Sequence, residues 1–329
     1  MNRIPRPLRL GPSRRQPAPG HPPSSVTSLY DEQLFARLRN LVIRSRHLSA
    51  SGLSGEHRSK RRGLSPEFSD FKPYSPGDDF RRIDWKTYAR FDELFVRESE
   101  TTTEYDLHLL IDASPSMDWS GDESRPTKLR YAQQLAGALA YLSLWHFDRV
   151  TVGPIHTPDG KVFGPIQGRN QIAPVFRYVE RLQTAANTGE ALAPSLARYV
   201  HARSRPGILI VISDCLDDDP HELERSLRNL AARGWETTLV RIEDPAEVDP
   251  ALLIEDGVNL ELADRESGLR MDVHGAQATF GQYREDRAAW SAAIDLLGVH
   301  QGTTVISART DETVDSLIFT RLRALGVVR

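Results

Sequence analysis

Hydroxyl and carboxylate side chains follow two short apolar runs of the sequence, in a spacing that could bind a hard metal ion. Asp112, Ser114 and Ser116 alternate after the first run, and Asp214 follows the second. Alternation along a loop could point the first three side chains the same way. An all-oxygen set suits Mg²⁺ held octahedrally with several waters retained, whereas zinc would want His or Cys. These four residues are therefore candidate Mg²⁺ ligands.

Strands and helices that alternate from residue 106 onward must position these ligands. We expect strands over 106–111, 150–155, 161–165, 208–212, 237–242 and 303–307, and helices over 128–147, 171–182, 190–203 and 220–233. Residues 208–212 (ILIVI) form a continuous apolar run, as in parallel strands covered on both faces. The alternation predicts right-handed crossovers and a three-layer α/β/α, doubly wound, mostly parallel sheet. In such sheets ligands bind outside the carboxyl ends of the strands, where the candidate ligands stand.

The pattern changes over about residues 245–300, which we interpret as an insertion. Residues 259–263 and 269–273 predict a β-hairpin, and a helix is expected over 276–297. The strand at 303–307 then returns to the main sheet, and a last helix is expected over 313–325. The chain thus divides into residues 1–28, 29–103 and 104–329, of which the last is the α/β domain.

The first part of the chain has a different composition. Residues 1–28 are rich in Pro and Arg, contain no acidic residue, and are expected to form a disordered arm. Leu34, Leu38, Leu41 and Val42 recur at helical spacing and predict a short amphipathic helix. Residues 29–103 are therefore expected to form an N-terminal extension of the α/β domain.

Bulk composition indicates an intracellular protein. The single cysteine, Cys215, excludes an intramolecular disulfide framework and is expected to be a small buried residue, and the N-terminus lacks the apolar core of a secretory signal. The longest uncharged run, 131–147, is shorter than the roughly 18 apolar residues of a membrane span. We therefore expect a cytoplasmic chain that does not enter the membrane.

Asp112, Ser114 and Ser116 resemble the first loop of the metal-ion-dependent adhesion site of von Willebrand factor A-like domains. Asp214 matches the acidic third loop of that site. The resemblance implies a Mg²⁺ ion with an open coordination position, which a carboxylate of a partner protein fills. It therefore implies protein binding rather than turnover.

The second loop of the adhesion site departs from this pattern. Aligning Ala191 and Leu192 with the family places Ala186 where the family has a threonine ligand. Thr188 or a water could take that position, in which case the ion binds weakly, or the site could be vestigial.

A second resemblance is carried by the segments FKPYSPGDD (71–79), RIDWK (82–86) and AR (89–90), and by DPAE (244–247) and DRESG (264–268). The sequence from about residue 63 to the end is similar to the bacterial domain of unknown function 58 family. The resemblance implies an adaptor that acts with a MoxR-type AAA+ ATPase, on an unknown protein client, in the maturation or remodelling of protein complexes. No G-x-x-x-x-G-K-[ST] phosphate loop is present, so the chain itself is not expected to hydrolyse ATP.

The segment over 71–90 has two interpretations. Ser75 to Asp78 (SPGD) predicts a turn, after which Trp85, Tyr88 and Phe91 would anchor the segment against a core. The alternative is that these aromatic side chains dock a partner.

Two other functions remain open from the sequence. In a Mg²⁺-dependent phosphohydrolase, Asp112 would be the nucleophile and Asp214 a metal ligand, but Ser114 stands where such enzymes have a second acid. A nucleic-acid binder would use the basic N-terminal region, including Arg58 to Arg62, which lacks aromatics for base stacking. We therefore expect a non-catalytic protein that does not depend on nucleic acid.

Overall fold

The computed structural model describes residues 32–43, 45, 70–75, 83, 85–91, 93–98, 106–156, 161–184, 191–203, 205–216, 219–253, 260–263, 270–273, 276–299 and 302–329. The chain forms two compact units, a smaller one within residues 52–104 and a larger one from residues 1–51 and 105–329. The larger unit contains the α/β fold and the candidate ligands.

The larger unit is built on a six-stranded sheet in the order β10-β7-β6-β3-β4-β5. The strands are β3 (Asp106–Asp112), β4 (Arg149–Ile155), β5 (Phe163–Gln167), β6 (Ile208–Ser213), β7 (Glu236–Glu243) and β10 (Thr303–Arg309). All neighbours pair in parallel except β4 and β5, which are antiparallel. The chain moves outward from β3 through β4 to β5, then returns to β6 and moves outward the other way. The topological switch point therefore lies between β3 and β6.

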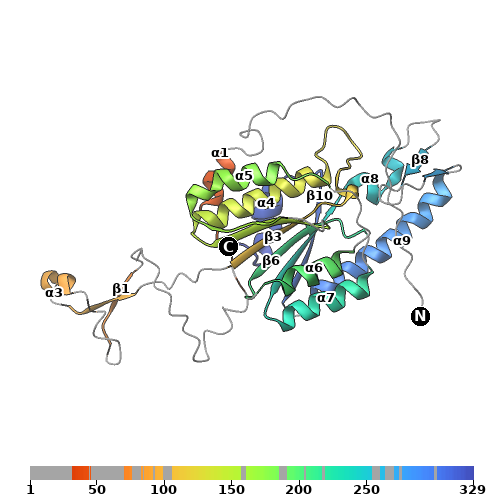
Figure 1. Cartoon of the computed structure of the whole chain (residues 1–329). Helices are drawn as coiled ribbons and strands as arrows, with labels where there is room; N and C mark the ends of the chain where they lie inside the picture. Colours follow the sequence, from red (N-terminus) through yellow and green to blue (C-terminus); the bar gives the residue numbers. More distant parts are fainter. Residues whose placement is uncertain are drawn as a thin grey trace. The chain divides into compact units, whose positions relative to one another are not determined.

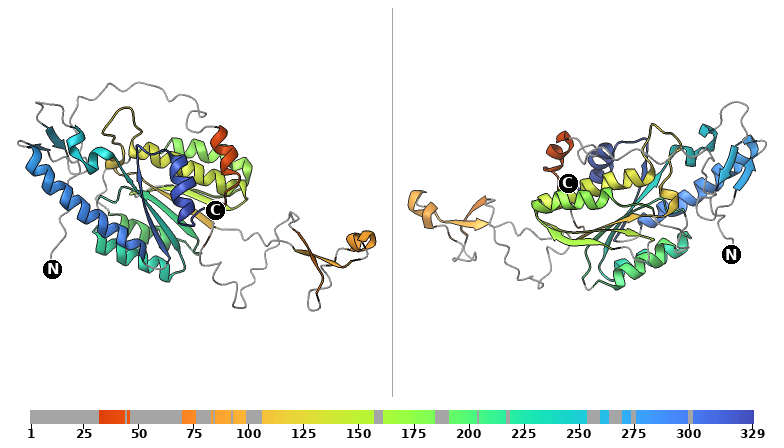
Figure 2. Two further views of the ribbon diagram at one scale, coloured as in Figure 1. Left: turned by 180° about the vertical axis from the view of Figure 1, so that it is seen from behind. Right: turned by 45° about the horizontal axis from the view of Figure 1, so that its top comes forward.

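Helices cover both faces of this sheet (Figures 1 and 2). One face packs against α1 (Glu32–Leu38), α4 (Lys128–Trp145), α5 (Ile172–Glu180) and the C-terminal helix, and the other against α6 (Leu192–His201), α7 (Pro220–Ala232) and α9 (Ala276–Leu296). Each face of the sheet has its own apolar core, and side chains along β6 alternate between the two. The core beside α4 contains Ile208, Ile210 and Ile212, and the core beside α7 contains Leu209 and Val211. The predicted three-layer α/β/α class is confirmed.

Between β7 and β10 the chain forms the predicted hairpin and helix. Short helical turns at α8 (Pro245–Val248) and Pro250–Leu253 come first. Strands β8 (Leu260–Ala263) and β9 (Arg270–Val273) then pair antiparallel, and α9 leads through the turn Leu297–Val299 into β10. The hairpin expected at 259–263 and 269–273 is therefore confirmed.

The C-terminal helix differs in type from the expected one. It begins as α10 (Val314–Ser316) and continues as a π-helical stretch over Leu317–Leu322. The Thr320 hydroxyl donates a hydrogen bond to the carbonyl of Ser316, which competes with the regular backbone ladder. The spacing of apolar residues in the sequence does not predict a local hydrogen bond of this kind, so the π-helical stretch could not be expected.

Helix α1 packs with the α/β body. The Arg39 guanidinium, just after α1, donates a hydrogen bond of 2.9 Å to the Tyr141 hydroxyl on α4, and Ile43 pairs with Val328. The amphipathic helix expected from Leu34, Leu38, Leu41 and Val42 is present but ends at Leu38, and Leu38 and Leu41 both lie in the core.

In the smaller unit, the described residues form two short strands and one helix. Strand β1 (Asp70–Pro73) pairs antiparallel with β2 (Phe95–Glu98), and α3 (Trp85–Phe91) lies between them in sequence. Within α3 the Trp85 and Tyr88 rings meet edge to face with centroids 6.2 Å apart. Most of the expected turn, Pro76 to Asp78, lies outside the described residues, and both interpretations of the segment stay predictions.

Candidate binding site at the carboxyl ends of β3 and β6

The candidate ligands of the first and third loops meet at one edge of the sheet, at the switch point. Asp112 is the last residue of β3, and Asp214 directly follows β6. The register pairs Ile111 with Ile212, so the two strands end side by side. The Asp112 and Asp214 side chains are both buried, each residue being 2% exposed. The sequence prediction that these residues converge is consistent with this register.

The first loop brings two hydroxyl groups together. Asp112 Oδ1 accepts a hydrogen bond of 2.8 Å from the Ser114 amide, and Pro115 opens a 3₁₀ turn that ends at Met117. This geometry places Ser114 Oγ 3.0 Å from Ser116 Oγ. Adjacent ligands of an octahedral Mg²⁺ ion at about 2.1 Å are separated by about the same distance. The hydroxyl pair therefore fits two neighbouring positions around such an ion.

The second carboxylate oxygen of Asp112 is held from the neighbouring strand. Ser213 Oγ donates to Asp112 Oδ2 at 2.5 Å and accepts a hydrogen bond of 3.0 Å from the Cys215 amide. His156 Nε2 lies 3.8 Å from the same Asp112 oxygen. Both oxygens of Asp112 thus have defined partners within the protein, and these bonds tie β3 to β6 at the site.

Two residues at this edge have a left-handed backbone. His156, after β4, has φ of 64°, and Cys215, after β6, has φ of 57°. Neither is glycine, so the surrounding structure must hold them in a sparsely populated region. Cys215 is 1% exposed, which confirms the expectation that it is a small buried residue.

The third loop already carries a cation, which the sequence did not lead us to expect. Lys128 Nζ lies 2.7 Å from Asp214 Oδ2 and 2.5 Å from Glu247 Oε1, and Lys128 is completely buried. The other oxygen, Asp214 Oδ1, accepts a hydrogen bond of 3.1 Å from the Leu216 amide. The first-loop hydroxyls therefore fit a Mg²⁺ ion, whereas the carboxylate of Asp214 is bonded to an ammonium group.

Burial and charge act in opposite directions on this ion pair. Burial disfavours the charged ammonium, but the Asp214 and Glu247 carboxylates outweigh it and raise the pKa of Lys128. Burial raises the pKa of Glu247, although Lys128 acts to lower it. One sequence signal could have drawn attention to Lys128: it is the first residue of α4, where the helix dipole disfavours a cation.

The loop after β3 packs closely against α8. A Cβ atom at Gly121 would lie 2.4 Å from the Cβ of Ala246 and 2.9 Å from Asp244 Oδ1. Asp244 caps α8 through a bond of 2.9 Å from the Ala246 amide. It also accepts a hydrogen bond of 2.9 Å from the Thr310 hydroxyl. The loop, α8 and the end of β10 therefore form one packed edge.

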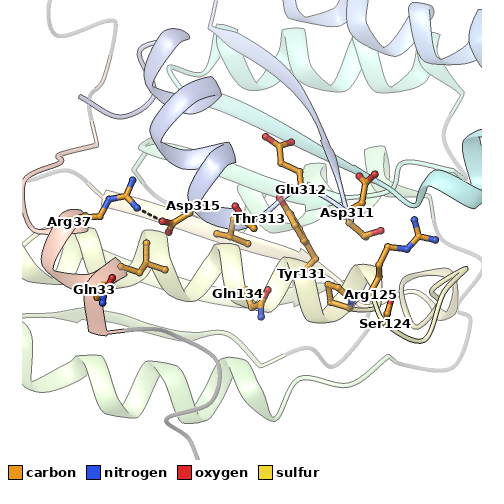
Figure 3. Close-up of a pocket in the computed structure, with 14 residues that line it drawn as sticks. Gln33, Arg37, Ser124, Arg125, Tyr131, Gln134, Asp311, Glu312, Thr313 and Asp315 are labelled. Carbon is orange, nitrogen blue, oxygen red and sulfur yellow. Dashed lines mark hydrogen bonds and ion pairs between the residues drawn. The ribbon is translucent and has the colours of Figure 1, made fainter.

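A cavity of about 690 Å³ lies beside this edge (Figure 3). It is lined by residues of α1, the start of α4 and the loop after β10. Arg125 borders it and also lies 3.5 Å from Asp244 Oδ1, which places the cavity next to α8. Tyr131 lies at its wall, and the Tyr131 hydroxyl has no hydrogen-bond partner among the described residues.

Several predicted features lie outside the described residues. These are Thr188 and Ala186 of the second loop, the arm at 1–28 and the basic stretch at 58–62. Thr188 therefore stays a predicted ligand. Across the described ranges, no three or more His, Cys, Asp or Glu side chains are grouped so that they could hold a metal ion. The first loop would use serine hydroxyls, which lie outside that set of residue types.

In the described part of the chain, no helix is both long and apolar enough to span a membrane.

Residues 70–292 match the family described as protein of unknown function DUF58. Uncharacterized proteins of Mycobacterium bovis and Mycobacterium tuberculosis are each 27% identical to the chain over 302 residues, covering 90% of it and 92% of the relative. The SpRpn10 VWA domain aligns with a TM-score of 0.38 and 9% identity, over 66% of this chain and 94% of that domain. An uncharacterized membrane spanning protein from Vibrio fischeri aligns with a TM-score of 0.21 and 15% identity, over 68% and 99%.

Proposed function

Since this chain belongs to the DUF58 family, we propose that it is a non-catalytic adaptor that binds a partner protein at the carboxyl ends of β3 and β6. The position of Asp112 and Asp214 at the topological switch point carries this proposal. In open α/β sheets this is the place where ligands bind. The hydroxyl pair of the first loop adds a means of binding a carboxylate of the partner through a metal ion.

The hydrogen bonds of Asp112 support binding over catalysis. A nucleophilic carboxylate must present a lone pair to the reacting phosphorus, and on each Asp112 oxygen one lone pair already accepts a hydrogen bond, from Ser114 or from Ser213. These bonds lower the nucleophilicity of the carboxylate and fix its orientation. Asp112 is better suited to hold the first loop in shape than to attack a substrate.

Mg²⁺ is the ion that this site would take. Ser114 and Ser116 would hold it directly, and Asp112 and Asp214 would supply negative charge beside it. When bound, the ion would present positive charge to an acidic side chain of the partner. Thr188 remains the proposed ligand from the second loop.

The partner and the compartment are proposals that rest on the family resemblance and on composition. We propose a MoxR-type AAA+ ATPase and a protein client as partners, with the ATPase providing the energy for remodelling. A single cysteine, with no disulfide possible within the chain, supports a reducing compartment such as the cytoplasm.

A capture experiment tests the proposal. The immobilised full-length chain is incubated with native lysate, and with a purified MoxR-type ATPase, in Mg²⁺ or in EDTA. We expect capture that is lost in EDTA and in Asp112→Asn, and kept in Glu285→Gln, a matched change at an exposed position of α9. Capture that is equal under all four conditions would contradict a role of the switch point, and Asp112-dependent phosphatase turnover in Mg²⁺ would contradict the non-catalytic assignment.

A further inference from the structure

Lys128 lies beside Asp214, at the edge of the sheet where a metal ion is proposed to bind. Both oxygens of Asp214 accept hydrogen bonds inside the protein, one from Lys128 Nζ at 2.7 Å and one from the Leu216 amide at 3.1 Å. A divalent ion needs a carboxylate lone pair that points toward it. As the residues lie, Lys128 holds one of the two Asp214 oxygens and the Leu216 amide holds the other.

Lys128 is placed there at a cost to helix α4. It is the first residue of the helix, where the dipole disfavours positive charge, and it is completely removed from water. Its backbone amide donates a hydrogen bond of 3.1 Å to the Trp119 carbonyl, which fixes the start of the helix against the first loop. The two carboxylates of Asp214 and Glu247 are what compensate its charge.

Glu247, in the inserted segment, is the second carboxylate that holds the lysine. Its Oε1 lies 2.5 Å from Lys128 Nζ, and its backbone carbonyl accepts a hydrogen bond of 2.7 Å from the Tyr283 hydroxyl on α9. The inserted segment, through α8 and α9, therefore fixes the ammonium group beside Asp214. A divalent ion brought to the same carboxylate would meet this fixed positive charge, and the two cations would repel each other.

We infer that Lys128 is a built-in cation that competes with a divalent metal ion for Asp214, so that it weakens metal binding at the Ser114–Ser116 pair. This inference rests on the proposed metal site and adds its regulation. The lysine satisfies the charge of the third loop when no ion is present. When an ion does bind, most of its direct protein ligands are the hydroxyls of Ser114 and Ser116, because Lys128 stays on Asp214.

The test compares metal affinity in the wild-type chain and in Lys128→Met/Glu247→Gln. This double change removes one positive and one negative charge, so the net charge is kept while Asp214 loses its cation and keeps the hydrogen bond from the Leu216 amide. Isothermal titration with Mg²⁺ and electron paramagnetic resonance with Mn²⁺ give the dissociation constants. We expect the double variant to bind at least tenfold more tightly than the wild type. Far-ultraviolet circular dichroism checks that each variant is folded.

Glu247→Gln alone is the matched control, because it leaves Lys128 on Asp214. Its affinity should stay within about twofold of the wild type or weaken. Equal dissociation constants in the wild type and the double variant, or an equal gain in Glu247→Gln, would overturn the inference and leave the metal site standing. Lys128→Gln/Glu247→Gln repeats the test with a polar side chain if the methionine version does not fold.

The failure of the metal site itself has a different signature. If neither chain binds Mg²⁺ or Mn²⁺ at millimolar concentration, both the metal site and the competition are wrong. The capture experiment is read separately, because an adaptor that binds its partner without metal would still be captured in EDTA.

Discussion

The hydroxyl of Ser213 donates a hydrogen bond of 2.5 Å to Asp112 Oδ2, across the boundary between β6 and β3. This bond joins the two strands that separate at the switch point. It fixes the orientation of the carboxylate on which the first loop is built.

Loss of this bond should destabilise the protein. In Ser213→Ala, Asp112 Oδ2 and the Cys215 amide each lose a buried partner, which should lower the free energy of unfolding by about 1–3 kcal/mol. Urea denaturation followed by circular dichroism measures the difference. Ser143→Ala on α4 is the control, because Ser143 is equally buried and its hydroxyl has no hydrogen-bond partner among the described residues. We expect little change there, and equal losses in the two variants would contradict this account.

Removal of the Lys128 side chain should be more damaging. Lys128→Met leaves the Asp214 and Glu247 carboxylates buried without their cation, and breaking a buried pair in this way costs about 3–5 kcal/mol. The midpoint of urea denaturation should fall accordingly. Adding Glu247→Gln removes one of the stranded charges and should recover part of the loss. A double variant no more stable than Lys128→Met would show that Glu247 is not a partner of the lysine.

Stability should fall in mild acid because of His108. Burial lowers the pKa of His108 from 6.5 to about 4, while the unfolded chain keeps the ordinary value. Below pH 6.5 the unfolded state therefore binds a proton that the folded state does not, and stability is lost progressively down to about pH 4. The loss attributable to this group is roughly 3 kcal/mol over that window.

His108→Gln separates this contribution from that of the acidic residues. Glutamine does not titrate and can keep a hydrogen bond to the Tyr199 hydroxyl, which lies 2.8 Å from His108 Nδ1. The free energy of unfolding of the variant should change less between pH 6.5 and pH 4 than that of the wild type. Parallel pH profiles would show that His108 does not titrate differently in the two states.

The contact between Gly121 and α8 predicts a compensating pair. Gly121→Ala would place its new methyl group 2.4 Å from the Cβ of Ala246, and this overpacking should cost about 1–3 kcal/mol. Adding Ala246→Gly removes the Cβ atom that the new methyl group would contact. The double variant should therefore be more stable than the sum of the two single changes predicts. A thermal or urea double-mutant cycle measures the coupling, and strict additivity would mean that the loop moves away freely.

The sequence predicts the architecture well because each strand carries its own signal. The run at 208–212 is apolar at every position, and the observed strand Ile208–Ser213 extends it by one residue. A continuous apolar run predicts a strand that is buried on both faces, whichever helices cover it, so the local sequence is sufficient. The same holds for the hairpin, where β8 and β9 each begin one residue later than predicted.

The candidate site was predictable only in part. Asp112 and Asp214 could be placed together because parallel strands end at the same edge. Lys128 could not, because it lies 86 positions from Asp214 and 119 from Glu247, and only the packing of α4 and α8 brings the three together. The spacing of apolar residues along a helix also does not predict whether a lysine at the end of that helix is buried or exposed.

The outer strand β5 has a consequence for how the protein behaves at high concentration. It runs antiparallel to β4, contains Pro165, which has no amide hydrogen to donate, and its register shifts between Val150 and Val152. Such an edge disfavours the addition of a regular strand by a second molecule, because Pro165 lacks one donor and the pairing with β4 is irregular. At this edge, a sheet whose centre is almost wholly aliphatic is thus protected against aggregation by strand addition.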